Sequence, residues 1–198
     1  DEQIQDVADF CFHSQGRICS MLESFAAGAK FEKKSWKHKE SGGGVYCVLR
    51  GEHIEKAGVN VSKVSGSSYP GEEGNCNNKA YTATGLSTIT HAYSPHVPIS
   101  HMNVRFIRVG EEYWFGGGAD LTPFIVYDED KEKFHNELKK VCEEFRNGSY
   151  NEFTKWCDQY FYIPHRKSIR GVGGIFFDRL QGDFKRLFEF IKNVVGAY

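Results

Sequence analysis

Hydrophobic residues recur every three or four positions near both ends of the chain, whereas the middle alternates over shorter runs. The helical spacing predicts helices within residues 1–27, 134–145 and 184–195. Ser149 is followed three positions later by Glu152, a spacing that is typical of a capping box. It predicts the start of a further helix at Ser149.

Short β-type runs fill the middle of the chain and are separated by glycine-containing links. The predicted strands are residues 44–49, 59–64, 81–90, 100–109, 113–115 and 171–177. No helical crossover fits between the first five of them, and short links favour antiparallel pairing. The pattern therefore predicts an α+β fold, a single domain in which a large antiparallel β-sheet is flanked by α-helices.

The composition agrees with one globular domain, since the 198 residues are 40% hydrophobic and 26% charged. Lys and Arg number 25 against 26 Asp and Glu, and a net charge of −1 argues against nucleic acid or an anionic membrane surface as a partner. No apolar run is long enough for a transmembrane segment, and no signal or transit segment is recognisable. The chain begins at Asp1 rather than Met, so earlier removal of such a segment by processing stays open.

The six cysteines are irregularly spaced and form no C-x-x-C pair, which argues against a zinc ribbon or a redox motif. Cys142 falls in a helical apolar pattern, as a reduced and buried thiol would. We therefore expect a reducing compartment.

One predicted strand separates two kinds of side chain. Positions 102, 104 and 106 are apolar, so His101, Asn103 and Arg105 project together from the other face. A proton carrier, an amide and a fixed cation on one face suit an anionic substrate that must gain or lose a proton. The alternative is a polar strand that faces solvent.

Three aromatic residues and the glycines of residues 116–118 come just before Asp120. We interpret the glycine run as a loop that lets the backbone approach a flat or bulky ligand. Neither GxGxxG nor a following Lys-Ser/Thr is present, so phosphate binding is not expected. A carboxylate behind such a cluster could accept N–H donors from a ring; a flexible hairpin is the alternative.

Basic and histidine-rich positions give a less specific signal. His91, His96 and His101 lie five residues apart, and His135 and His165 follow. Clustered histidines can bind a divalent metal, but this spacing fits neither one helix face nor one strand face, so both interpretations remain open. The basic, glycine-rich residues 164–174 could bind carboxylates or form a solvated turn.

Several motifs together resemble the oxygen-dependent coproporphyrinogen III oxidase family. They are HMNVR at residues 101–105, WFGGGADLTP at 114–123, PHR at 164–166, RGVGGIFFD at 170–178, residues 36–44 and EKAGVNVS at 55–62. The similarity extends from about residue 31 to residue 198. It implies an antiparallel sheet flanked by helices, a homodimer, and oxidative decarboxylation of two propionates of coproporphyrinogen III to give protoporphyrinogen IX for haem synthesis. Dioxygen is the co-substrate, CO2 and H2O2 leave, and no organic cofactor is implied.

The resemblance also implies roles for individual residues. His101 matches the proton donor of the family, and Asp120 matches a buried carboxylate that engages pyrrole N–H groups. The implied substrate contacts are Ser87, Asn103, Val104 and Arg105.

The resemblance leaves the metal and the compartment open. Some relatives are assigned a divalent metal on positions matching His91, His101, His135 and His165, whereas others are held to work without one. Relatives occur in cytoplasm, mitochondria and plastids, and we expect a cytoplasmic protein.

Two departures from the family pattern leave alternatives open. Residues 93–94 are Tyr-Ser where the family usually has Arg-Asn. The family also continues beyond the point where this chain ends, so residues 1–198 are expected to form an oxidase-like domain without the C-terminal part. The alternatives are a catalytically inactive tetrapyrrole-binding homologue or truncated subunit, and a divalent-metal hydrolase built on the histidines.

Overall fold

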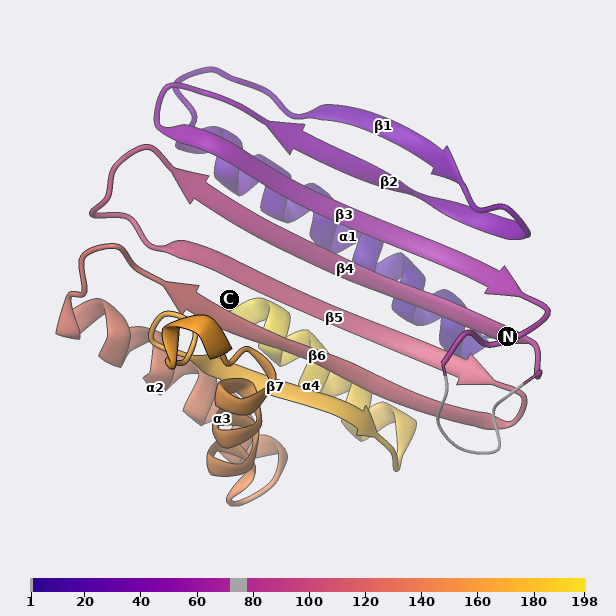
Figure 1. Ribbon diagram of the computed structural model, residues 1–198. Coiled ribbons are helices and arrows are strands. Elements are labelled where there is room, and N and C mark those ends of the chain that lie inside the picture. The colour runs from indigo at the N-terminus through magenta and orange to yellow at the C-terminus, as the bar shows by residue number, and fades with distance from the viewer. Residues whose placement is uncertain (1, 72–77) are drawn as a thin grey trace.

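The computed structural model describes residues 2–71 and 78–198 (Figure 1). The elements in chain order are α1 (Glu2–Ser24), β1 (Glu32–Lys37), β2 (Ser41–Leu49), β3 (Ile54–Gly66), β4 (Tyr81–Ala92), β5 (Ile99–Val109), β6 (Glu112–Thr122), α2 (Asp128–Phe145), α3 (Ser149–Tyr160), the short 3-10 helix η2 (Pro164–Arg166), β7 (Gly174–Leu180) and α4 (Phe184–Ala197).

The seven strands form one antiparallel sheet in which every strand pairs with the next one along the chain. Short turns join β1 to β2 and β5 to β6, and antiparallel neighbours are the strands that such turns can join. In the described part of the chain, helices separate consecutive strands only between β6 and β7, where they are α2, α3 and η2. The predicted α+β fold with a large antiparallel sheet is confirmed.

One face of the sheet is covered by α1 and α4, which lie behind the strands in Figure 1. In β5, strand alternation turns Met102, Val104 and Phe106 toward these helices. Inside this core, the Gln15 amide of α1 donates to the carbonyl oxygens of Val45 and Val59, each at 2.9 Å. The helix is thereby fixed over β2 and β3.

Among the described residues, no α-helix lies over β1 to β5 on the opposite face (Figure 1). This face is covered at the end of β5, where Val109 and Trp114 are buried against Tyr69 and Tyr81, and beside β7, where α3 packs along the edge strand. There the Tyr160 ring stacks on Phe176 with 3.9 Å between centroids, and Phe161 meets the same ring edge-on. We call the uncovered side the open face.

Two local predictions were wrong. The glycine run at residues 116–118 is the middle of β6 and not a loop, because it pairs with β5 on one side and β7 on the other. A Cβ on Gly117 would lie 2.5 Å from the Asn103 carbonyl oxygen, so the neighbouring backbone approaches too closely for a larger residue. Ser149 forms no capping box: Gly148 is the N-cap, and the Ser149 hydroxyl donates to the Cys142 carbonyl oxygen at 2.6 Å.

The strand β1 was missed, and several elements are longer than expected. Five of the cysteines are buried free thiols, and burial raises the pKa of Cys142 to about 12. Cys76 lies outside the described residues.

Candidate active site

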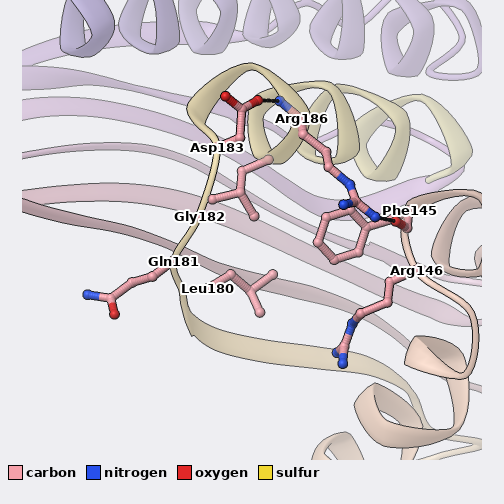
Figure 2. Close-up of a pocket in the computed structure, with 8 residues that line it drawn as sticks. Phe145, Arg146, Leu180, Gln181, Gly182, Asp183 and Arg186 are labelled. Carbon is pink, nitrogen blue, oxygen red and sulfur yellow. Dashed lines mark hydrogen bonds between the residues drawn. The ribbon is translucent and has the colours of Figure 1, made fainter.

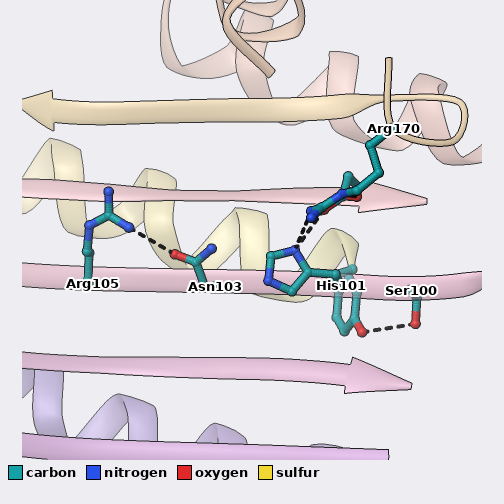
Figure 3. Close-up of polar contacts among 7 residues, drawn as sticks. Ser100, His101, Asn103, Arg105 and Arg170 are labelled. Atoms are coloured by element: carbon teal, nitrogen blue, oxygen red, sulfur yellow. Dashed lines mark hydrogen bonds and ion pairs between the residues drawn. The ribbon is translucent and has the colours of Figure 1, made fainter. Parts of the chain in front are cut away.

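The polar residues of β5 meet those of β4 and β6 in rows that cross the open face. His101 pairs with Asp120, and Asn103 pairs with Ser87. The alternation predicted for β5 is confirmed, since His101, Asn103 and Arg105 stand together on this face (Figure 3). Antiparallel register therefore brings side chains from three strands together.

A compact cluster forms where β5, β6 and the loop before β7 meet. The Nδ1 atom of His101 lies 2.7 Å from Oδ1 of Asp120. Arg170 donates to the same carboxylate twice, from Nη2 to Oδ1 at 2.6 Å and from Nε to Oδ2 at 2.8 Å. Its Nη2 also lies 3.3 Å from the His101 Nδ1 atom.

Asp120 is the buried member of this cluster, with a side chain only 3% exposed. Burial by itself raises the pKa of a carboxyl group, but the hydrogen bonds from His101 and Arg170, and the Arg170 charge, outweigh it. The pKa of Asp120 is therefore held below its ordinary value, and the group is a carboxylate at neutral pH.

The Asp120 carboxylate fixes how His101 presents its ring. A carboxylate only accepts hydrogen bonds, so Nδ1 must carry the proton that it donates to Oδ1. The other ring nitrogen, Nε2, has no hydrogen-bond partner in the described part of the chain and lies on the Asn103 side in Figure 3. His101 is thus held, 21% exposed, with one nitrogen available for proton exchange above the sheet.

Arg170 is the functional candidate that the sequence pattern did not single out. It comes from the basic, glycine-rich segment before β7, and its guanidinium carbon lies 3.5 Å from the centroid of the Phe161 ring. The bidentate contact to Asp120 joins residues 50 positions apart in the sequence. A basic patch was visible in the sequence, but its partner was not.

Arg105 stands two residues further along β5 and has an acidic neighbour of its own. Its Nη2 lies 3.0 Å from Oδ1 of Asp178 on β7, and its Nη1 donates to the Asn103 Oδ1 at 3.3 Å. Both charged side chains are about one-third exposed, at 32% and 33%, so an incoming carboxylate can reach the guanidinium. Asn103 uses only its Oδ1 atom in this contact, so its amide N–H groups remain available to a ligand.

Val104 differs from the other predicted substrate contacts. Its side chain is 2% exposed and points into the helix-covered core. Any contact to a ligand on the open face would therefore have to come from its backbone.

The four histidines predicted as metal ligands are not gathered at one point. His135 on α2 uses both ring nitrogens, with the Tyr150 hydroxyl and the Val172 carbonyl oxygen each at 2.8 Å. His165 is exposed in η2, and His91 lies on β4 two residues beyond Ile89, the cross-strand neighbour of His101. Within residues 2–71 and 78–198, no group of three or more His, Cys, Asp or Glu residues is arranged to hold a metal ion. This arrangement does not fit a shared metal, and no step below uses one.

Ser100, the residue before His101 in β5, connects the sheet to the end of α4. The Ser100 hydroxyl, on the same side of β5 as Met102, lies 3.0 Å from the Tyr198 hydroxyl. Burial raises the pKa of Tyr198, so the phenol stays neutral in this position. The strand that carries His101 is thus held from both faces.

Two hollows differ in their relation to this cluster. A hollow of about 590 Å³ lies on the open face above β1 to β4. Another, of about 350 Å³, lies between the end of α2 and the start of α4, where Arg186 donates to the Phe145 carbonyl oxygen (Figure 2). None of the predicted site residues lines the latter, so the open face is the candidate site.

Comparison with known families gives the same assignment. A family model described as coproporphyrinogen III oxidase matches residues 6–198. The chain belongs to the coproporphyrinogen III oxidase family. Membership implies an oxidative decarboxylase of porphyrin biosynthesis that acts on coproporphyrinogen. Among the described residues, no helix combines the length and the apolar character needed to span a membrane.

Proposed function

We propose that this chain catalyses the oxygen-dependent conversion of coproporphyrinogen III to protoporphyrinogen IX in haem biosynthesis. Each of two propionate side chains, with one O2 and one proton, gives a vinyl group, one CO2 and one H2O2. No organic cofactor enters this balance. The observation that carries the proposal is the buried Asp120 that holds His101 and Arg170 at the edge of an open sheet face.

The balance requires one proton for each decarboxylation, and His101 is placed to provide it. Its Nδ1 is bound to a carboxylate, so its Nε2 can exchange a proton while the ring keeps its orientation. The Asp120 carboxylate keeps the ring in the same orientation from one turnover to the next.

The broad macrocycle of the substrate suits a broad and largely uncovered sheet face. Arg105 and the Asn103 amide can bind a propionate carboxylate, because charge-assisted hydrogen bonds to carboxylates are the strong ones. Both Asp120 oxygens are already occupied by His101 and Arg170. The Asp120 side chain is also only 3% exposed, so we assign it the role of positioning His101 rather than direct contact with pyrrole N–H groups.

The proposal includes a homodimer that works in the cytoplasm. The homodimer rests on the family resemblance, and the cytoplasm is the expectation stated from the sequence.

The test is aerobic turnover of coproporphyrinogen III that has been prepared without oxygen. Porphyrin fluorescence follows the product, and its mass reports whether two vinyl groups have formed. Protoporphyrinogen formed only with oxygen supports the proposal. Binding of the tetrapyrrole without any product would favour the inactive homologue instead.

A further inference from the structure

The hollow on the open face lies next to the cluster but contains none of the residues assigned to it. Its walls are aromatic, with Trp36 39% exposed and Tyr46 36% exposed. Its polar members are Lys56, Asn60 and His91. An exposed apolar surface with a few polar groups is typical of a ligand site.

The strand register makes this hollow continuous with the His101 site. Ile89, in its wall, is the cross-strand neighbour of both Gly58 and His101. Asn60 pairs with Ser87, which pairs with Asn103. Adjacent strands are about 4.8 Å apart, so the hollow at Gly58 begins about 10 Å from His101. A macrocycle that covers His101 and extends toward β1 must enter it.

Two glycines in strand interiors keep the hollow empty of protein. A Cβ on Gly44 would lie 2.8 Å from the Trp36 Nε1 atom, so this glycine lets the indole lie over β2. A Cβ on Gly58 would meet nothing closer than an Ile89 methyl group at 4.0 Å. Glycine weakens a strand, and here neither a turn nor a close backbone neighbour requires it at Gly58. The space above Gly58 is therefore room for a ligand.

The charges at the edge of the hollow select an acidic ligand. Lys56 on β3 pairs directly with His91 on β4. Neither side chain has an ion-pair or hydrogen-bond partner in the described segments. Two basic groups side by side without a carboxylate would both gain from one supplied by a ligand.

We propose that this hollow binds one of the substrate's pyrrole rings that carry an unreactive propionate. Lys56 binds the carboxylate of that propionate, and Trp36 and Tyr46 lie beside the ring. The assignment rests on the proposed function, because it takes the ligand to be a tetrapyrrole with several carboxylate arms. It makes Lys56 a specificity-determining residue at the far side of the macrocycle from His101.

The first test measures porphyrin binding by fluorescence titration. Coproporphyrin III carries all four arms, whereas mesoporphyrin IX keeps only the two that do not react. Lys56→Met should raise the Kd for both porphyrins about tenfold, and Lys56→Arg should restore most of the affinity. Lys37→Met is the matched control, because Lys37 is an exposed lysine on the helix-side face of β1. Equal Kd values for Lys56→Met and Lys37→Met would overturn the proposal, and so would a loss confined to coproporphyrin.

A second variant tests the space rather than the charge. Gly58→Val should fill the hollow and leave Tm unchanged or higher, because a β-branched residue favours a strand. Its Kd for coproporphyrin should rise at least tenfold. Unchanged binding by a folded Gly58→Val protein would show that the hollow is not used.

The same experiments separate the two proposals. If the wild type binds and turns over substrate while Lys56→Met and Gly58→Val behave like the wild type, only the subsite is wrong. If the wild type neither binds nor turns over the tetrapyrrole, the proposed function and the subsite both fail.

Discussion

The two faces of the sheet are made from alternate residues of the same strands, yet they carry different tasks. In β5, Met102 and Phe106 are fully buried under the helices. On the open face of the same strand, His101 and Arg105 remain 21% and 32% exposed. A strand can thus hold its packing on one side and its chemistry on the other, because its side-chain period is two. Substitutions on the two faces should therefore separate stability from activity.

Asp120→Ala should give the largest loss of activity. Without the carboxylate, neither the ring orientation of His101 nor the position of Arg170 is held. We expect kcat/KM for coproporphyrinogen III to fall about 1,000-fold while circular dichroism shows a retained fold. Near-normal turnover would remove Asp120 from the mechanism.

Phe106→Ala tests the other face of β5. The Phe106 ring is fully buried and packs 4.7 Å from the Phe115 ring, centroid to centroid. Its removal should lower the free energy of unfolding by about 3–5 kcal/mol, with kcat little changed where the protein is still folded. Urea denaturation measures the loss, and Phe106→Leu should cost less. A large fall in kcat for folded protein would contradict the separation of the faces.

His101→Ala should affect the chemical step more than binding. We expect kcat to fall about 100-fold and the Kd of coproporphyrin III to change little, since Arg105 and Asn103 are untouched. Steady-state kinetics and a binding titration measure the two effects separately. A higher KM with an unchanged kcat would make His101 a binding residue only.

The Asp120 carboxylate makes the stability of the fold depend on pH. Its pKa is lowered in the folded protein from the ordinary value of 3.8, so the ionised form stabilises the fold. The free energy of unfolding should be larger for the wild type than for Asp120→Asn, and this difference should reach its full size at pH values above that ordinary pKa. It should be lost as the pH falls through the lower folded-state pKa. Denaturation of both proteins across this pH range checks the sign, and a difference that grows toward acid would contradict it.

Substitutions at two adjacent glycines of β6 should have the smallest effects, and they compare the two faces of the sheet most directly. A Cβ on Gly116 would lie 2.8 Å from the Arg105 Nε atom, at a flexible side chain on the open face. A Cβ on Gly117 would meet the Asn103 backbone. Gly116→Ala should raise KM a few-fold with little change in Tm, whereas Gly117→Ala should lower Tm. The same Tm loss for both would show that β6 tolerates no side chain at either position.

Much of the fold could be predicted from the sequence because periodicity reports burial directly. The helical stripes and the two faces of β5 follow from it, and the antiparallel pairing follows from the short links between strands. β1 was missed because EKKSWK is almost entirely polar, as an exposed edge strand can be. The glycines of β6 suggested a loop because glycine is a poor strand former, and only the backbones on both sides explain them.

The candidate site could be predicted only in part, for the same reason. His101, Asn103 and Arg105 lie on one strand, where local alternation suffices. Arg170 meets Asp120 across the helical connection, and no local pattern encodes that contact. Its position depends on how α3 and Phe161 pack against β7.

The long connection between β6 and β7 has a kinetic consequence. The links between consecutive strands from β1 to β6 are all much shorter than the segment between β6 and β7, so each of these pairings closes a shorter loop, whereas β7 must return across the whole span of α2 and α3. We expect β7 to join the sheet last during folding. The imidazole of His101 would then receive its full set of neighbours only at that final step, so that a chain with six paired strands is still inactive. Recovery of turnover would consequently report the end of folding, later than the signal from the sheet.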